Sequence, residues 1–256
     1  MTSPLRSVAR YAALAAALCS LGCAERARQS GPTPTTTSVQ QFGAMRAVMR
    51  EGSTEARVAL REWAGPNDVA VGAIEQLDGE ITIVDGGAWV SRVRDGDVLT
   101  SGPAVEPDAK ATLLTASRVG AWHSNRLHET LAGAELEAAI VRAAAERGID
   151  TSQPFPFIIR GTATSLHMHV INGFCPHSSG EAAAGREPRR IALTEPTPVT
   201  IVGFYASDAQ GLLTHHGTAM HAHALVDGDG GRVTGHVDSV EIQAGATLRL
   251  PDAPPP

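Results

Sequence analysis

The sequence has few clusters of basic residues and few aromatic residues, and both features limit the classes of function that the protein can have. The net charge is -6 at pH 7, and basic residues gather only in the short segment GREPRR at residues 185–190. Nucleic-acid binding requires a clustered basic surface, so we expect no nucleic-acid partner. Aromatic residues make up 4% of the chain, whereas histidines number ten, five of them between His215 and His236. Histidine is therefore the residue type most informative about function.

The apolar run near the N-terminus, residues 11–22, is too short to cross a bilayer as a stable helix. Arg6 and Arg10 precede it, which is the arrangement of an export signal, so we predict a lipoprotein-type signal peptide at residues 1–22. The run ends in SLGC, which resembles the lipobox of bacterial lipoproteins. This predicts a lipid anchor at Cys23 that holds the exported protein to a membrane of the bacterial cell envelope, at the periplasmic or outer surface. A cleaved signal peptide without lipid is the alternative.

A flexible linker is predicted at residues 23–38, because its segment GPTPTTTS has no side chains to bury. Cysteine is scarce in the remainder of the chain. Processing would remove Cys19 and modify Cys23, which leaves Cys175 as the only thiol. No intramolecular disulfide can then form, and we interpret Cys175 as an ordinary, partly buried residue.

Residues 39–150 are predicted to form an N-terminal α/β subdomain that opens with two short helices. Apolar residues recur at helical spacing within 39–49 and again within 53–63. Asp78-Gly79 is a strong hairpin signal between two strands. The Ala-rich segment 128–147 has apolar residues on one stripe and charges on the other, which predicts one long helix. The strands predicted in this part are 68–76, 80–86 and 88–96.

Residues 151–252 are predicted to form a C-terminal β subdomain. Alternating or continuous apolar runs mark its strands, and a Gly-, Ser- and Pro-rich segment interrupts them between 172 and 198. The expected fold class is α+β, with a mixed β-sheet and helices in the N-terminal part and a largely antiparallel C-terminal part. The strands predicted here are 155–171, 199–206, 219–226, 232–242 and 246–250.

Three histidines in this C-terminal part are expected to meet. His221 and His223 project from one face of an extended strand, because side chains two residues apart point the same way. A two-residue turn at Asp229-Gly230 would pair 228 with 231 and, five rungs further along the ladder, His223 with His236. Opposed Cβ atoms lie about 4.5 to 5.5 Å apart. Two imidazoles at that separation can share one metal ion.

The same register would place Asp238 opposite His221, where it could be a fourth ligand. We favour the interpretation that Asp238 accepts a hydrogen bond from an imidazole N–H and orients that ring. A single H-x-H motif usually marks solvated histidines on a hairpin, but three histidines on one face with an acid beside them favour a metal site. Three protein ligands leave one coordination position open, as in catalytic zinc sites. Zinc is the expected metal, although imidazole ligands also suit Cu, Fe and Ni.

A second pair, His167 and His169, lies on another predicted strand and also shares one face. These side chains could line the same pocket from a neighbouring strand. Either histidine alone is more often a surface residue, so we do not count them among the ligands.

Several segments together resemble the alpha-acetolactate decarboxylase family over roughly residues 40–250. They are GAMRAVMREG, VAVGAIEQLDGEITIVDGGAW, PFIIRGTATSLHMHV, TIVGFYA, and HAH followed by GHV. The resemblance implies a zinc enzyme that converts 2-acetolactate to acetoin and carbon dioxide, with His221, His223 and His236 as metal ligands. The glutamate of LDGE maps onto Glu80, which the resemblance assigns to moving a proton in the reaction. A substrate of this kind, a 2-hydroxy-3-keto acid, can chelate a metal through its hydroxyl and carbonyl oxygens.

Two departures from the family pattern leave the activity open. His169 stands where the family has a catalytic arginine, and a C-terminal glutamate of the family has no counterpart before Pro256. Arg160 is an odd number of residues from His169 and would face the other side of a continuous strand. Three hypotheses follow: a decarboxylase in which His169 replaces the arginine, a metalloenzyme for a different small hydroxy-keto substrate, and an exported metal-binding protein without catalysis. The sequence does not determine the oligomeric state, and a homodimer is one candidate.

Overall fold

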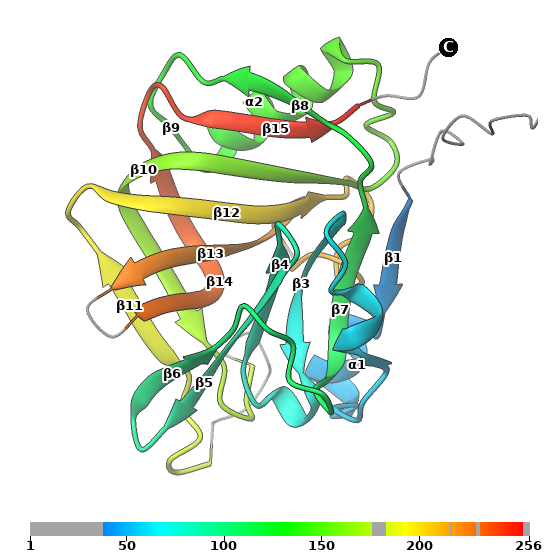
Figure 1. Ribbon diagram of the computed structural model, residues 1–256, viewed down its shortest axis with the longest axis vertical. Helices are drawn as coiled ribbons and strands as arrows, with labels where there is room; N and C mark the ends of the chain where they lie inside the picture. The colour runs from blue at the N-terminus through cyan, green and yellow to red at the C-terminus, as the bar shows by residue number, and fades with distance from the viewer. Residues whose placement is uncertain (1–37, 176–182, 216, 229–230, 253–256) are drawn as a thin grey trace, which may run out of the picture. The chain divides into compact units, whose positions relative to one another are not determined.

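The computed structural model describes residues 38–175, 183–215, 217–228 and 231–252, and Figure 1 shows two β-sheets in this part of the chain. The predicted signal peptide, nearly all of the predicted linker and the lipidation site Cys23 lie outside these ranges, so they stay predictions. Within the described ranges, no helix has the length and apolar character needed to cross a membrane.

The first sheet has the strand order β1-β7-β3-β4-β5-β6, with β2 paired to β7. Every pairing in it is antiparallel, so the prediction of a mixed sheet in the N-terminal part is wrong. The hairpin predicted at Asp78-Gly79 is confirmed, because β3 and β4 pair as far as Ala73 and Glu80. The elements are β1 (Val39–Phe42), α1 (Met45–Glu51), β2 (Val58–Ala59), η1 (Leu60–Trp63), β3 (Asp68–Ile74), η2 (Glu75–Leu77), β4 (Glu80–Val84), β5 (Gly87–Arg94), β6 (Asp97–Ser101) and β7 (Lys110–Arg118).

The two predicted opening helices form only in part. The segment 39–49 divides at Gly43, whose φ of 75° breaks the helical path. Its first four residues pair with β7 as strand β1, and only the remainder forms α1, which ends at the left-handed Gly52. The segment 53–63 contains β2 and a short 3-10 helix. Pairing with the long strand β7 satisfies backbone groups that a short isolated helix would leave exposed, and this tertiary gain outweighs the helical pattern.

The second sheet has the order β8-β15-β10-β12-β13-β14-β9, with β11 paired to β10. Strand β10 is long enough to pair with β12 through its first half and with β14 through its second half. Because β12 also pairs with β13 and β13 with β14, these four strands form a closed circuit. The elements are β8 (Trp122–Arg126), β9 (Leu131–Ala132), α2 (Gly133–Glu146), β10 (Phe155–Val170), β11 (Arg189–Leu193), β12 (Thr197–Tyr205), β13 (Met220–Gly228), β14 (Gly231–Ile242) and β15 (Thr247–Pro251).

The C-terminal part is antiparallel as expected, and it takes in more of the chain than predicted. Strands β8 and β9 pair with β15 and β14, so the change of sheet falls between β7 and β8. The predicted division stood near residue 150. The long helix predicted at 128–147 forms as α2, with a later start because Leu131–Ala132 adds a short strand at its N-terminus.

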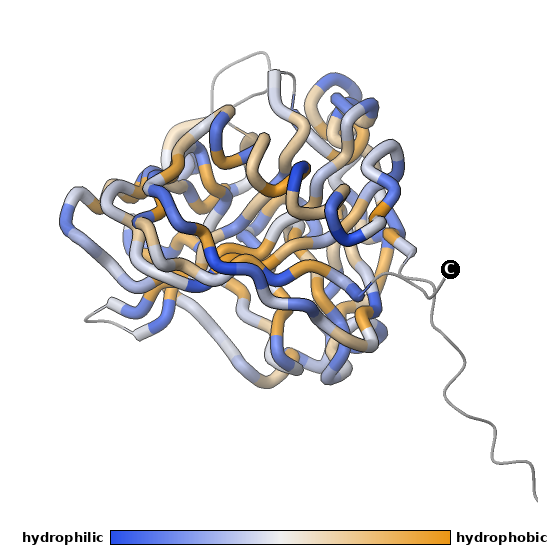
Figure 2. The backbone as a smooth tube through the Cα atoms, turned by 90° about the horizontal axis from the view of Figure 1, so that it is seen from above, coloured by the Kyte–Doolittle hydropathy of each residue, from blue (hydrophilic) through white to orange (hydrophobic). Residues whose placement is uncertain are grey.

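The two sheets share a hydrophobic core. One cluster of buried aliphatic side chains joins Val69 and Val71 of β3 to Ile158 of β10 and Val202 of β12. Strand β14 also contacts β4, β5 and β6. Figure 2 shows hydrophobic segments concentrated inside and hydrophilic ones at the outer turns. The interface between the sheets is therefore desolvated, and polar side chains that enter it need partners or a ligand.

Candidate metal centre

The three histidines predicted as ligands lie on one hairpin, formed by β13 and β14. The register pairs Gly228 with Gly231 and His223 with His236, as the sequence predicts. The turn residues Asp229 and Gly230 lie outside the described residues, so the turn type stays a prediction. Because His221 is two residues before His223 on β13, the register brings all three side chains to one face.

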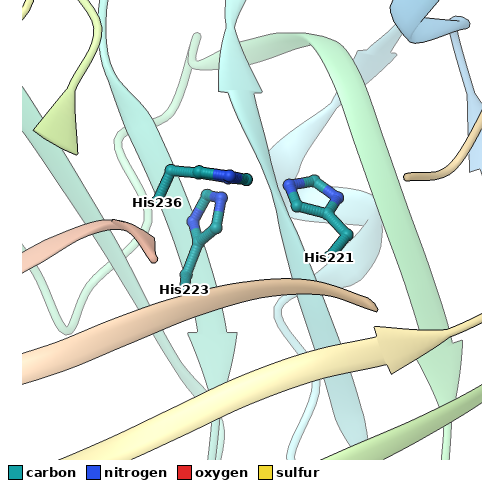
Figure 3. A group of neighbouring side chains, drawn as sticks. All are labelled: His221, His223 and His236. Atoms are coloured by element: carbon teal, nitrogen blue, oxygen red, sulfur yellow. The ribbon is translucent and has the colours of Figure 1, made fainter. Parts of the chain in front are cut away.

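The three imidazoles point toward one another (Figure 3). Each offers one ring nitrogen, and these nitrogens lie within 4.8 Å of one another. Two nitrogens bound to one zinc ion at about 2.0 to 2.1 Å are at most about 4.2 Å apart, so small ring rotations would complete a site. All three side chains are buried, with exposed fractions of 5%, 1% and 8% for His221, His223 and His236.

The chemistry of this donor set fits a metal ion. Nδ1 of His221 and Nε2 of His223 are buried and have no hydrogen-bond partner within the described part of the chain, which is costly unless a ligand takes the lone pairs. Burial, the largest cause, and the neighbouring histidines lower the pKa of His221 and His236 well below 6.5 and that of His223 to about 3. The rings are therefore neutral at pH 7, the form that binds metal.

Neighbouring side chains orient one of these rings from the other sheet. Oγ1 of Thr82 on β4 lies 3.3 Å from Nδ1 of His223 and 2.5 Å from Oγ1 of Thr234 on β14. The hydroxyl of Ser91 accepts a hydrogen bond from the Thr234 amide at 2.9 Å. Contacts of this kind hold a ligating imidazole in one orientation.

Asp238 does not lie opposite His221, so that part of the sequence prediction is wrong. The β13–β14 pairing ends at His223 and His236, and beyond it β14 pairs with β10. A register shift there pairs residue 167 with 239 and 168 with 237, which leaves Asp238 at a bulge. Its Oδ1 lies 2.9 Å from Nδ1 of His169, so the acid orients His169 rather than a predicted ligand.

Glu80 reaches the same region from the first sheet. It begins β4, it is 4% exposed, and its Oε2 lies 3.5 Å from Nε2 of His223. The amide of Ile171 donates a hydrogen bond to its Oε1 at 3.4 Å. Burial raises the pKa of Glu80 to about 8, and the charge of Asp238 adds to this rise against the Ile171 hydrogen bond. A carboxyl group with this pKa can hold a proton near neutral pH and release it.

A pocket of about 440 Å³, measured with its open mouth, adjoins the three-histidine group. Glu80, His169, His221 and His236 form its polar side, and His169 is 2% exposed. His167 is exposed and lies against Ser239, so only one histidine of the second predicted pair lines the pocket. The opposite side is apolar and is formed by Met45, Val48, Met49, Leu77, Leu113 and Ile171.

His215 belongs to the site, and sequence reasoning missed this. Its ring centroid lies 5.0 Å from that of His236 and 6.3 Å from that of His221, and the side chain lines the pocket. It sits in the segment between β12 and β13, where no strand period or turn register predicts a side-chain direction. The only sequence signal was the density of histidines from residue 215 onward.

The metal-free protein should be most stable near pH 6.5. Below that pH the unfolded chain protonates three histidines whose folded pKa is lowered, so acidification toward pH 3 destabilises the fold. Glu80 acts in the opposite sense between its usual pKa of about 4.5 and its folded pKa of about 8, because the unfolded chain has already lost this proton. The three histidines outweigh this effect below pH 6.5, and above that pH the Glu80 effect lowers stability as the pH rises to about 8. Thermal unfolding of chelator-treated protein across pH 5 to 8 measures this. An unchanged melting temperature between pH 5 and 6.5 would contradict it.

Together, the fold and the site define a two-sheet antiparallel β protein with a buried three-histidine group of the kind that can hold a metal ion. The sequence matches the alpha-acetolactate decarboxylase family over residues 39–250. The chain belongs to this family, which confirms the resemblance found in its motifs. Among curated proteins, no sequence matches this chain significantly.

Solved structures agree with this assignment at the level of the fold. Alpha-acetolactate decarboxylase from Bacillus subtilis strain 168 is 17% identical with a TM-score of 0.63, over 84% of this chain and 86% of that one. A Staphylococcus aureus protein described as of unknown function and similar to alpha-acetolactate decarboxylase is 16% identical with a TM-score of 0.61, over 83% and 84% of the two chains. The enzyme from Bacillus subtilis subspecies spizizenii is 17% identical with a TM-score of 0.62, over 84% and 87%.

Proposed function

We propose that this protein is a zinc-dependent decarboxylase that converts 2-acetolactate to acetoin and carbon dioxide. One observation carries the proposal: three buried histidines of the second sheet meet beside Glu80 of the first sheet, and Glu80 lines one pocket together with His221 and His236. Zinc, when bound, would act as a Lewis acid toward the hydroxyl and carbonyl oxygens of the substrate. His221, His223 and His236 would hold it, and a fourth position would stay open for the substrate.

The proton in this reaction is assigned to Glu80. When the bond between C2 and the carboxylate breaks, carbon dioxide leaves and the electron pair stays on the remaining carbon skeleton. C2 must then receive one proton to give acetoin. The buried Glu80 carboxyl, with its pKa raised to about 8 in the metal-free protein, holds such a proton at neutral pH. Solvent would restore it, because each turnover consumes one proton.

His169 is proposed to contact the carboxylate end of the substrate, in place of the arginine expected from the family pattern. It lines the pocket beside His236, with 5.0 Å between the ring centroids. Asp238 holds the ring through its Nδ1. A histidine reaches less far than an arginine and lacks its two-pronged donor geometry, so this side chain also supports a second candidate, an enzyme for a different small hydroxy-keto acid.

Purified protein incubated with racemic 2-acetolactate should release acetoin. Treatment with a chelator should abolish the release, and added zinc should restore it, because the open coordination position is where the substrate would bind. Turnover is measured as acetoin formed, and the dependence on metal is measured by elemental analysis of the protein before and after treatment.

Two outcomes would contradict the proposal. Turnover of another hydroxy-keto acid with no release from 2-acetolactate would favour the second candidate. One bound metal ion per chain without turnover of any such acid would indicate a metal-binding protein that has kept the family fold.

A further inference from the structure

A strained turn joins β3 to β4 and leads directly into the proposed site. Gln76 and Leu77 adopt left-handed φ values of 61° and 55°, and Gly79 follows with φ of 138°. Left-handed backbone at a residue other than glycine costs energy and persists only when surrounding contacts hold it. The turn presents two pocket-lining side chains, Leu77 on the apolar side and Glu80 on the polar side.

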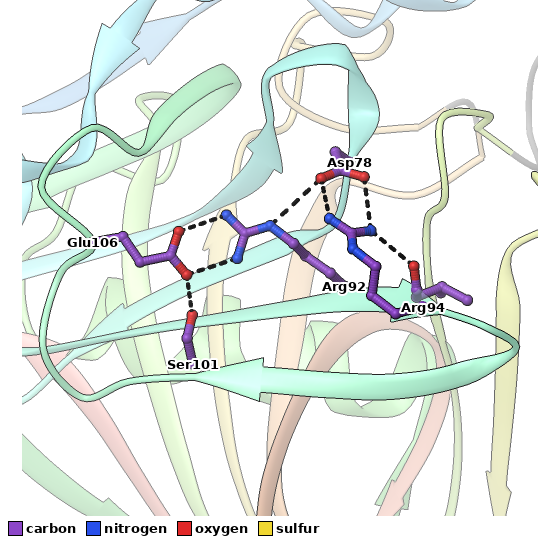
Figure 4. Close-up of polar contacts among 6 residues, drawn as sticks. Asp78, Arg92, Arg94, Ser101 and Glu106 are labelled. Atoms are coloured by element: carbon purple, nitrogen blue, oxygen red, sulfur yellow. Dashed lines mark hydrogen bonds and ion pairs between the residues drawn. The ribbon is translucent and has the colours of Figure 1, made fainter.

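Asp78 stands between these two residues in the sequence and is not among the residues that line their pocket. Its carboxylate belongs to a network of charges (Figure 4). Both of its carboxylate oxygens accept hydrogen bonds from Arg94, at 3.0 and 2.5 Å. Nε of Arg92 lies 3.5 Å from Oδ2 of Asp78. Arg92 also donates two hydrogen bonds of 2.8 Å to Glu106, which accepts a third from Ser101.

The geometry of this network distinguishes it from ordinary surface ion pairs. A single exposed ion pair stabilises a protein little, whereas networks of bidentate arginine–carboxylate pairs contribute measurably to the stability of the fold. Arg92 and Asp78 are the less exposed members, at 19% and 27% of their side chains. Hydrogen bonds from Arg92 hold the pKa of Glu106 below its usual range, so the acid stays ionised at neutral pH.

We propose that Asp78, through Arg92 and Arg94, is a positioning residue that sets the place of Glu80 in the pocket. This inference rests on the proposed decarboxylase function, since the role of Glu80 does. Arg92 follows Ser91, which pairs with Glu80 across the β4–β5 ladder. The network therefore connects the turn to strand β5, which lies beside Glu80. Glu80 is restrained by Asp78, two residues before it in the turn, and by the neighbouring strand, where Arg92 follows its partner Ser91.

Other contacts keep the turn folded when the network is weakened. The amide of Gln76 donates to the carbonyl of Thr54 at 2.7 Å, and Leu77 accepts a hydrogen bond from the Gly173 amide at 2.7 Å. The amide of Ile74 donates to the carbonyl of Gly79 at 3.0 Å. Loss of the Asp78 charge is therefore expected to displace Glu80 and not to unfold the protein.

The test compares Asp78→Asn with Asp85→Asn. Asp85 lies at the opposite end of the same β4–β5 hairpin and also bridges two arginines, Arg160 and Arg249. We expect Asp78→Asn to lower kcat about 10-fold to 100-fold with little change in KM, because small misplacements of a reacting group cost rates of this order. Metal content should stay at the wild-type value in both variants. Asp85→Asn should keep the wild-type kcat.

Amide hydrogen exchange gives a readout that does not depend on activity. The Ile171 amide bonds to Glu80, and the Ile74 amide closes the turn. Both amides should exchange faster in Asp78→Asn and at the wild-type rate in Asp85→Asn. Unchanged exchange of both amides, or an unchanged kcat in an active enzyme, would overturn the inference. If the wild-type protein releases no acetoin, the proposed function fails and the exchange rates alone decide the positioning role.

Discussion

Replacing His223 with alanine is expected to abolish metal binding and acetoin formation together. His223 is 1% exposed, and its Nε2, which lies 3.5 Å from Oε2 of Glu80, has no hydrogen-bond partner among the described residues, so a bound metal ion would satisfy this buried atom. Lewis-acid assistance contributes several kcal/mol to a reaction barrier. Because each 1.36 kcal/mol is a factor of ten, the rate should fall by at least ~1000-fold.

The matched control is His167→Ala, which removes an exposed histidine outside the pocket. That variant should keep its metal and its rate. A circular dichroism spectrum of each variant shows whether the β-sheets remain folded. If His223→Ala binds one metal ion with wild-type affinity, the three-histidine assignment is wrong. His221→Ala then serves as a second check on the same group, because its Nδ1 is also buried without a partner.

Glu80→Gln is expected to separate the proton chemistry from metal binding. Glutamine keeps the size of the side chain and can still accept the Ile171 hydrogen bond, but it cannot deliver a proton at neutral pH. General acid–base groups contribute about 100-fold to 10,000-fold. We therefore expect kcat to fall by that factor while the metal content stays at the wild-type value.

Glu75→Gln is the control for Glu80→Gln, because it makes the same substitution on the same turn and Glu75 does not line the site pocket. Measurement of kcat and of bound metal for both variants distinguishes a role of Glu80 in proton transfer from a role in metal binding. A Glu80→Gln enzyme with wild-type kcat would show that the proton comes from another group. A variant that loses its metal would assign Glu80 to the coordination sphere.

Local rules predicted the hairpin that holds the three histidines. Side-chain direction alternates along β13, and the register of β13 with β14 follows from a turn of two residues between Gly228 and Gly231. Neither argument needs information about distant parts of the chain. The same reasoning failed at Asp238, because β14 leaves β13 after His236 and pairs with β10 through a bulge. A bulge depends on the neighbouring strand, which no local pattern specifies.

The predicted N-terminal helices also show that a local pattern does not specify which distant strand a segment pairs with. The spacing of apolar residues in 39–49 fits a helix, yet Val39–Phe42 pairs with Ser117–Leu114 of β7. Strand β7 was not predicted, so no pairing partner could be weighed against the helical pattern. The apolar spacing therefore predicted the helix from Met45 onward and missed the strand that precedes it.

The sequence by itself determined the hairpin with its three histidines, the motifs of the alpha-acetolactate decarboxylase family and the antiparallel character of the C-terminal part. Only the tertiary structure decided that Glu80 faces His223 across two sheets, that Asp238 orients His169, and that His215 joins the site. The physical reason is the range of the interactions involved. Side-chain periodicity and turn geometry act over a few residues, whereas strand pairing and the packing of the two sheets bring together residues that are far apart in the sequence, such as Asp238 with His169 and Glu80 with His223.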